Sequence, residues 1–381
     1  MKKVLAVLLA LAMVFTLAAC GGEKEETGAA GAIKVGATGP LTGGAAIYGQ
    51  AVKNGAEIAV EEINALGGLQ FEFNMQDDAH DAEKSVNAYN DLKDWGMQIM
   101  MGTVTSAPAE ATAAEAYADR MFFLTPSASS TDVTKGKDNI FQMCFADPNQ
   151  GSGAAQYIAE NNMATKVGMI YKSDDNYSMG IRATFLTKAA ELGLEVVAEE
   201  AFTDATSTDF TVQVAKMQEA GAELVFLPMY YTPASLIFAQ AKATGYAPTW
   251  FGVDGMDGIL TLEGFDTTLA EGVVLLTPYS ADDTSALNQA FVAKYQEKYG
   301  EVPNQFAADA YDCIYSLYKA ATAAGLTSDM SVEESCDAMI AQFTSMTFDG
   351  LTGANMTWDK AGAVSKSPNA MVIENGAYVG L

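Results

Sequence analysis

The chain alternates short apolar strands with amphipathic helices, and this alternation occurs twice. The first series predicts strands over Ile33–Thr38, Phe71–Gln76, Gln98–Met101 and Met121–Leu124. The second series predicts strands over Lys166–Tyr171, Leu194–Glu199, Leu224–Leu227 and Thr249–Gly252. Two successive βαβαβ series indicate an α/β protein with two doubly wound lobes, each built on a largely parallel sheet.

Apolar residues at helical spacing predict the helices between and after these strands. One begins near Tyr48 and ends at Gly67-Gly68, and the others are expected over Tyr177–Leu192, Thr211–Ala220, Pro233–Thr244, Thr284–Lys298, Phe306–Ala324 and Val332–Phe343. Short strands are expected around Asn355–Trp358 and Ala370–Ile373. We expect this C-terminal part to complete one lobe or both.

The first residues have the composition of an export signal. Lys2 and Lys3 precede the apolar run Val4–Leu17, which is too short for a comfortable membrane span and is typical of a signal-peptide core. The segment Leu17-Ala18-Ala19-Cys20 looks like a bacterial lipobox, which predicts a signal peptide over residues 1–20 and lipidation of Cys20. An ordinary secretory signal with an incidental Cys20 is the alternative. Residues 21–32 are rich in Gly, Ala and Glu and are expected to form a flexible tether.

Composition argues against several classes of function. The chain has 21 Lys and Arg against 48 Asp and Glu, a formal charge of −27, which repels nucleic acid and anionic lipid headgroups. Arg120 and Arg182 are the only arginines, so an Arg cluster for phosphates is missing. His80 is the only histidine, which disfavours a Ser-His-Asp triad or a multi-histidine metal site. We therefore expect that the protein is not an enzyme and has no cofactor or metal.

Three cysteines remain once Cys20 is set aside. Cys144, Cys313 and Cys336 are odd in number and widely spaced, which suits neither a disulfide framework nor a zinc site. We interpret them as small buried apolar residues, although Cys313 and Cys336 could pair.

The loops that follow the predicted strands divide into two chemical types. Ligands of open parallel sheets bind at the carboxyl ends of the strands, next to helix N-termini. The first series offers hydroxyls and helix N-termini, which suit a carboxylate, in Gly39–Gly44, Gly102–Pro108 and Thr125–Ser130. The second offers tyrosines and a carboxylate, which suit an ammonium group, in Asp174–Tyr177, Pro228–Thr232 and Gly252–Gly255. Two such faces together predict a site for a zwitterion.

Several segments, in order and spacing, carry a family resemblance. They are Ile33–Gly36, Gly39–Gly43, Glu62–Gly68, the Asp77-Asp78 turn, Thr125–Ala128, Gln305–Tyr311, Leu351–Gly353 and Thr357–Asp359. The chain resembles the branched-chain amino acid type of periplasmic binding protein, over at least Ile33–Trp358. The resemblance implies the type I architecture, with two lobes joined by a three-segment hinge and the ligand in the cleft between them. It places the crossings near Asp147, Thr277 and Lys366, so that lobe I comprises 33–147 plus 278–366 and lobe II 148–277 plus 367–381.

The resemblance also implies a ligand-binding set. Ser106 and the segment Ser127-Ala128-Ser129 would hold the α-carboxylate and part of the α-ammonium, and Asp254 would face the ammonium. The aromatic residues that would line the pocket are Tyr48, Tyr177, Tyr230 and Phe306.

Each of these assignments has a plainer alternative. Ser106 and Ser129 could be helix caps, and Asp254 could stabilise the turn at Gly255. Tyr231 could replace Tyr230 after a one-residue shift, and Phe306 could be ordinary core. The acidic turn Asp77–Asp81 resembles a metal site, but we predict a loop and a helix cap.

The sequence also departs from the family's pattern. Some relatives carry a disulfide where this chain has His80 and Thr105. Asp254 is one methylene shorter than the Glu that relatives may carry, and Met229 makes the pocket wall adaptable. These departures concern the ligand's side chain more than the class of protein.

The resemblance implies an extracytoplasmic, lipid-anchored and monomeric solute-binding protein on the outer face of a bacterial cell membrane. It would pass a branched-chain or related L-amino acid to an ABC permease after hinge closure. The alternatives are a ligand-sensing receptor on the same fold, a solute that is amide-like, urea-like or aromatic, and a secreted hydrolase. The hydrolase is disfavoured because the chain has no Gly-x-Ser-x-Gly motif.

Overall fold

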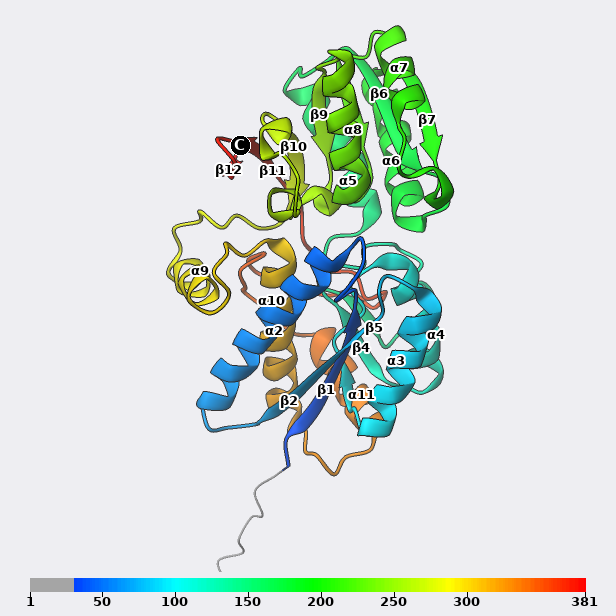
Figure 1. Ribbon diagram of the computed structural model, residues 1–381. Coiled ribbons are helices and arrows are strands. Elements are labelled where there is room, and N and C mark those ends of the chain that lie inside the picture. The colour runs from blue at the N-terminus through cyan, green and yellow to red at the C-terminus, as the bar shows by residue number, and fades with distance from the viewer. Residues whose placement is uncertain (1–30) are drawn as a thin grey trace, which may run out of the picture. The chain divides into compact units, whose positions relative to one another are not determined.

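The structure is a computed structural model that describes residues 31–381 (Figure 1). The predicted signal peptide, Cys20 and nearly all of the predicted tether lie outside the described residues. The chain divides into the units Met1–Gly31 and Ala32–Leu381, and every helix and strand of the described residues belongs to the second unit. Within the described residues, no helix combines the length and the apolar character needed to cross a membrane.

The first sheet is parallel throughout and has the strand order β2-β1-β3-β4-β5. Strand β1 pairs on both edges, so that Val35 is opposite Phe73 of β2 and Ile99 of β3. The strands are β1 (Ile33–Gly39), β2 (Phe71–Asp77), β3 (Ile99–Met100), β4 (Phe122–Thr125) and β5 (Ile140–Gln142).

Helices cover both faces of this sheet (Figure 1). Because side chains alternate along a strand, Ile99 packs into the cluster with α2 (Ala46–Ala65) and α10 (Gln305–Ala324), whereas Met100 packs on the opposite side. That opposite side carries α3 (Ala82–Trp95) and α4 (Ser106–Ala118). Two further helices complete this part: α9 (Ala286–Tyr299) packs on α2, and α11 (Val332–Phe343) contacts β3 and β4.

The second sheet has the order β12-β11-β10-β9-β8-β6-β7 and is parallel except at one edge. Its parallel strands are β6 (Lys166–Lys172), β7 (Glu195–Phe202), β8 (Leu224–Leu227), β9 (Thr249–Gly252) and β10 (Val274–Thr277). The antiparallel edge is a hairpin of β11 (Asn369–Glu374) and β12 (Ala377–Gly380). Asn375 and Gly376 join them, both with positive φ, as a tight two-residue hairpin turn requires.

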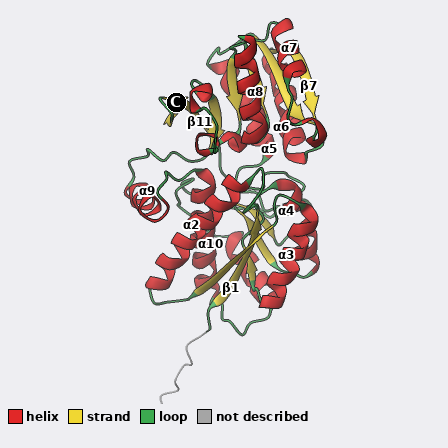
Figure 2. Ribbon diagram, in the orientation of Figure 1, coloured by secondary structure: helices red, strands yellow, loops and turns green. Residues whose placement is uncertain are grey.

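The helices of the second sheet form two packed pairs, α5 (Asp147–Glu160) with α6 (Asn176–Leu192) and α7 (Thr211–Glu219) with α8 (Tyr231–Thr244). Figure 2 shows the resulting alternation of helices with sheet strands. Four short 3-10 turns follow strands of this sheet: η1 (Asp204–Thr206), η2 (Asp254–Met256), η3 (Ile259–Thr261) and η4 (Thr267–Ala270). The turn η2 comes directly after β9 and carries Asp254.

The predicted fold class, two largely parallel α/β sheets, is confirmed. One predicted strand is wrong: Asn355–Trp358 forms only isolated bridges, from Met356 to Phe348 and from Trp358 to Val364. Asn355 has a positive φ of 52°, which breaks an extended run at its first residue. The predicted lobe boundaries stay a prediction.

The sequence left the pairing of the cysteines open. Within residues 31–381, Cys144, Cys313 and Cys336 are all buried and free, so the disulfide considered between Cys313 and Cys336 is not formed.

Candidate functional site

A small cavity lies among the strand-end loops and brings most of the predicted ligand residues together. It is lined by Tyr48, Val104, Thr105, Ser106, Ser127, Tyr177, Tyr230, Asp254, Gly255 and Phe306. Its volume is about 10 Å³, which leaves room for roughly one water molecule. Of the predicted set, only Ala128 and Ser129 are not in its wall.

Tyr48 links the two groups of loops. It lies in the first turn of α2, and its hydroxyl donates to the Gly255 carbonyl oxygen at 2.5 Å. The same hydroxyl accepts a hydrogen bond from the Tyr231 N–H at 3.3 Å. Phe306, at the start of α10, packs on the Tyr48 ring with 4.3 Å between ring centroids. Phe306 therefore belongs both to the hydrophobic core and to the cavity wall.

Asp254 is the acidic group of the cavity. Its Oδ1 accepts a hydrogen bond of 2.5 Å from the Tyr177 hydroxyl. Burial raises the pKa of Asp254 to about 7. None of the ion pairs found within residues 31–381 includes it. The carboxyl group is hydrogen-bonded to neutral groups and lacks a cationic partner in the described part of the chain.

A second buried acid, Asp147, interacts with the charge of Asp254. Asp147 begins α5, and its Oδ1 has no hydrogen-bond partner among residues 31–381. Burial raises the pKa of Asp147 well above its usual range, and the charge of Asp254 raises it further. Two buried carboxyl groups without a cation favour a positively charged ligand group nearby.

The opposite wall of the cavity is made of hydroxyl-bearing loops at the N-terminus of α4. Thr105 precedes this helix but makes no side-chain capping bond to it. The Ser106 hydroxyl accepts from the Ser130 N–H at 3.2 Å, and the Ser127 hydroxyl donates to the Val104 carbonyl oxygen at 2.7 Å. A helix N-terminus without a side-chain cap attracts anions, so this wall suits a carboxylate.

Ala128 and Ser129 support this wall from behind. The Ala128 N–H donates to the Thr125 hydroxyl at 2.9 Å, and its carbonyl oxygen accepts from Gln142 at 2.7 Å. The Ser129 carbonyl oxygen accepts from the Asp147 N–H at 2.9 Å. Both residues are buried, and their main-chain bonds fix the loop that presents Ser127.

Tyr230 and Tyr231 differ in whether the side chain points toward the cavity. Tyr230 lines the cavity and stacks on Tyr177 with centroids 4.8 Å apart, and its hydroxyl lies beside the Ser106 N–H. Tyr231 turns away from the cavity, and its hydroxyl accepts from the Ile47 N–H at 3.3 Å. Tyr230 therefore lines the cavity together with Ser106 and Asp254, and Tyr231 does not.

The acidic turn Asp77–Asp81 is a loop and a helix cap, and no cluster suited to a metal ion occurs among residues 31–381. Asp77 Oδ1 accepts from the Leu41 and Ala79 N–H groups, and Asp81 caps α3 through the Lys84 N–H. His80 Nδ1 lies 2.8 Å from Thr105 Oγ1. A hydrogen bond therefore joins the two positions where the family resemblance places a disulfide in some relatives.

Two supporting glutamines escaped the sequence analysis. Gln150 accepts from the Asp254 N–H at 3.1 Å, and Gln305 donates to the Asp254 carbonyl oxygen at 2.7 Å. Val104, Thr105 and Gly255 also line the cavity. The only sequence signal for these wall residues was their position in strand-end loops.

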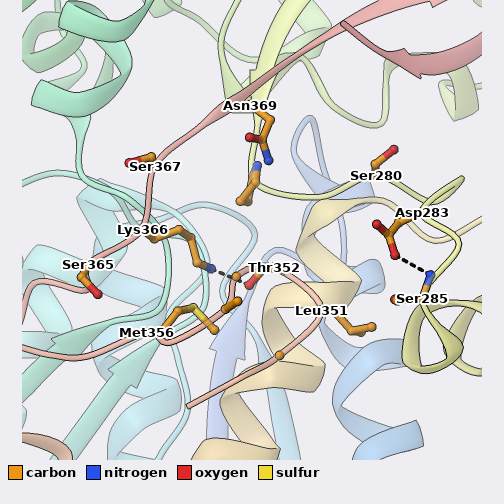
Figure 3. Close-up of a pocket in the computed structure, with 14 residues that line it drawn as sticks. Ser280, Asp283, Ser285, Leu351, Thr352, Met356, Ser365, Lys366, Ser367 and Asn369 are labelled. Carbon is orange, nitrogen blue, oxygen red and sulfur yellow. Dashed lines mark hydrogen bonds between the residues drawn. The ribbon is translucent and has the colours of Figure 1, made fainter. Parts of the chain in front are cut away.

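A larger hollow of about 480 Å³ contains none of the predicted ligand residues. Figure 3 shows Lys366 in its wall, directed toward Thr352. The Lys366 ammonium makes an ion pair of 2.8 Å with Asp309, and both side chains are nearly inaccessible. The charge of Lys366 is therefore already neutralised, which makes this hollow a poor site for a charged ligand.

Known proteins resemble the whole described chain. A leucine-, isoleucine-, valine-, threonine- and alanine-binding protein of Pseudomonas aeruginosa is 28% identical over 360 residues, which is 92% of each chain. The isoleucine complex of the branched-chain amino acid transporter substrate-binding protein LivJ from Streptococcus pneumoniae superposes with a TM-score of 0.83 at 28% identity, covering 91% of this chain and 98% of that one. The leucine-binding protein LivK of Thermotoga maritima gives 0.82 at 26% identity, covering 92% and 97%.

The family model described as periplasmic binding protein matches residues 32–377. This match covers the first sheet, the second sheet except most of its edge strand β12, and every residue that lines the small cavity. The chain belongs to the periplasmic binding protein family.

Proposed function

We propose that this protein is the extracytoplasmic substrate-binding component of an ABC importer and that it binds a small L-amino acid in the cavity around Asp254. The observation that carries the proposal is the buried Asp254 carboxyl group, which faces Tyr177 and has no cationic partner within residues 31–381. A buried carboxylate is stabilised by a charged, hydrogen-bonded partner, and the α-ammonium of an amino acid supplies one.

The other end of the ligand would meet the hydroxyl wall. The α-carboxylate would accept hydrogen bonds from Ser106, Ser127 and the first N–H groups of α4, where the helix dipole favours negative charge. A solute with a carboxylate alone, such as an aromatic acid, would leave Asp254 unpaired. This difference favours a zwitterion over an aromatic solute that lacks an ammonium group.

Binding requires the cavity to enlarge. A volume of about 10 Å³ holds no amino acid, and Tyr230, stacked on Tyr177, is part of the wall that limits it. We propose that Tyr230 moves aside, or that the two walls separate, and that Tyr48, Tyr177 and Phe306 then enclose the aliphatic side chain. A branched-chain amino acid is the default ligand, in keeping with the names of the relatives.

Isothermal titration calorimetry tests this proposal. The purified protein is partially unfolded to remove carried-over ligand, refolded, and titrated with leucine, isoleucine, valine, alanine, threonine and, as a carboxylate-only control, benzoate. We expect one-to-one binding of at least one aliphatic amino acid and no heat from benzoate. If correctly folded protein binds none of these amino acids, the proposal is wrong and the ligand belongs to another class of solute.

The anchoring and the transport role need separate experiments. A Cys20→Ser variant should be released from the membrane fraction if Cys20 is lipidated. Deletion of the gene should abolish uptake of the amino acid identified by calorimetry. Intact uptake with loss of a transcriptional response to that amino acid would instead favour a sensor.

A further inference from the structure

A further cavity, distinct from the hollow lined by Lys366, also has a volume of about 480 Å³. This size is typical of small-molecule sites. Its wall is formed by residues 257–261 after η2, by residues 277–282 after β10, and by the turn of the β11–β12 hairpin. Helix α9 and residues 302–304 before α10 complete it. No residue of its wall is shared with the small cavity around Asp254. Much of its lining is apolar, from Leu260, Ala281, Val292, Val302, Pro303 and Ala377.

Two polar groups in this wall are buried and incompletely bonded. Asp257 is 4% exposed, and its Oδ2 accepts from the Gln305 N–H at 2.8 Å. Its Oδ1 has no hydrogen-bond partner of good geometry within residues 31–381, although the nearby Tyr378 hydroxyl offsets part of the rise that burial causes in the pKa of this carboxyl group. Tyr279 is 5% exposed, and its hydroxyl has no partner in the same part of the chain. Buried polar atoms are nearly always hydrogen-bonded, so two orphans in one cavity wall indicate a missing bound group.

The charge of the wall defines what that group is. Among the described residues that line the cavity, Asp257 and Asp282 are acidic and none is Lys, Arg or His. Burial raises the pKa of Asp257 only to about 6, so this carboxyl group is mostly ionised at neutral pH. Tyr279 and Tyr378 add aromatic rings, whose faces attract cations. An anion would meet only repulsion here.

We propose that this cavity is a second ligand site, for a small organic cation that carries a primary ammonium group on a compact apolar body. The ammonium donates to Asp257 Oδ1 and to the Tyr279 hydroxyl oxygen, while the apolar body packs against Leu260, Val292 and Val302. Both orphan atoms then gain a partner, and the acidic wall gains a counter-charge.

The site is linked to the amino acid cavity through one short turn. The Asp257 N–H donates to the Asp254 carbonyl oxygen at 3.0 Å. Gln305 contacts both residues: its main-chain N–H donates to the Asp257 carboxyl group, and its side-chain amide donates to the Asp254 carbonyl oxygen. A cation bound at Asp257 therefore stabilises the turn that presents Asp254, without occupying the amino acid site.

The probes for the test are isoamylammonium and phenethylammonium, with neutral isoamyl alcohol as the matched control. Saturation-transfer NMR on the full protein measures their binding to the wild type and to the variants Asp257→Asn, Tyr279→Phe and Asp254→Asn. We expect saturable binding of the ammonium probes and little binding of the alcohol. Asp257→Asn, which can still accept from Gln305, should weaken ammonium binding at least roughly tenfold, and Tyr279→Phe should weaken it less.

Asp254→Asn separates this site from the amino acid site, because it should remove amino acid binding but leave the ammonium probes bound. Circular dichroism confirms that each variant is folded. The proposal is overturned if the ammonium probes do not bind saturably, which would mean a cavity filled by water only. It is also overturned if Asp257→Asn binds the probes as well as the wild type, or if Asp254→Asn alone abolishes their binding.

Discussion

The Tyr177 hydroxyl donates a hydrogen bond of 2.5 Å to Asp254 Oδ1, and these side chains are only 2% and 4% exposed. The bond joins the first turn of α6 to the turn η2 after β9. A phenol stabilises a carboxylate without neutralising it, so the negative charge of Asp254 remains available to a ligand. The pair therefore both orients Asp254 and keeps it partly ionised despite its burial.

Substituting Tyr177→Phe should weaken amino acid binding at neutral pH by about tenfold, the equivalent of about 1.4 kcal/mol. Without the phenol, the pKa of Asp254 should rise above its value of about 7, and more of the carboxyl group would be protonated and unable to pair with an ammonium. Calorimetric titrations at pH 7 and pH 8.5 measure both effects, and the deficit should shrink at the higher pH.

Tyr231→Phe is the matched control, because Tyr231 loses the same atom but lies outside the cavity wall. Its affinity should stay within about twofold of the wild type, since the buried Tyr231 hydroxyl bonds to the Ile47 N–H and does not line the cavity. Equal losses in the two variants would mean that the Tyr177–Asp254 bond has no special role.

Substituting Asp254→Asn should stabilise the ligand-free protein at high pH and leave it unchanged at low pH. In the folded state the pKa of Asp254 is raised from its ordinary value of 3.8 to about 7. Between these values the folded protein binds more protons than the unfolded chain, so stability falls as pH rises through this window and stays low above it. Asn cannot ionise, and its advantage at pH 8 should be roughly 1–4 kcal/mol.

Urea unfolding of both proteins at pH 4.5 and pH 8 measures this difference. The comparison between the two proteins matters, because Asp78 and Asp312 also have pKa values raised to about 6 by burial, whereas hydrogen bonds lower the pKa of Asp77. Those groups affect both proteins equally. If the difference in free energy of unfolding between the two proteins is no larger at pH 8 than at pH 4.5, the raised pKa of Asp254 is contradicted.

The sequence predicted elements well where a periodic pattern was long enough to read. Val332–Phe343 and Leu224–Leu227 match their observed bounds. β5 was missed because three residues are too few to show a periodic pattern. β12 was missed because the Asn375-Gly376 pair, which forms the hairpin turn before it, was not used as a turn signal. Asn355–Trp358 was mistaken for a strand because isolated bridges need the same local residue types as ladders.

The site was predictable at its loops but not in its support. Strand-end position and residue chemistry pointed to the loops that contain Ser106, Tyr177 and Asp254, and the family resemblance selected these residues within the loops. They could not select Gln150, which is 104 positions from Asp254 and meets it only through the tertiary fold. Choosing Tyr230 over Tyr231 likewise required the direction in which each side chain leaves the start of α8, and irregular backbone gives no periodicity to predict it.

Substituting Gly55→Ala should destabilise the protein by about 1–3 kcal/mol. Gly55 lies where α2 crosses α10, and an added methyl carbon would lie 2.0 Å from the Ala307 carbonyl oxygen. Backbone cannot yield as a flexible side chain does, so the two helices would have to separate. The midpoint of urea unfolding, followed by circular dichroism, measures the change.

Gly153→Ala is the control for Gly55→Ala, because Gly153 also lies inside a helix but its added methyl would meet only side-chain atoms, at 3.5 Å or beyond. There the helix propensity of Ala should prevail and raise stability by about 0.5–1 kcal/mol. If both substitutions change the stability in the same direction, the close approach of α2 and α10 at Gly55 does not determine the effect of Gly55→Ala.

Substituting Lys366→Met should cost about 3–5 kcal/mol, because it leaves the Asp309 carboxyl group unpaired in a buried position. The two side chains are 1% and 2% exposed, and Lys366 also donates to the Thr352 hydroxyl. Urea unfolding at pH 7 measures the loss, with Lys135→Met as control. The ion pair of Lys135 with Asp132 is exposed, so its removal should cost less than about 1 kcal/mol.

The double variant Lys366→Met with Asp309→Leu distinguishes the cost of an orphaned charge from the value of the pair itself. Removing both charges eliminates the unpaired carboxylate, so the double variant should recover much of the stability lost by Lys366→Met. If it is instead less stable than Lys366→Met alone, Asp309 contributes through packing or through Thr352 even without its partner. In that case the ion pair would not be the reason why Lys366 is buried next to β11.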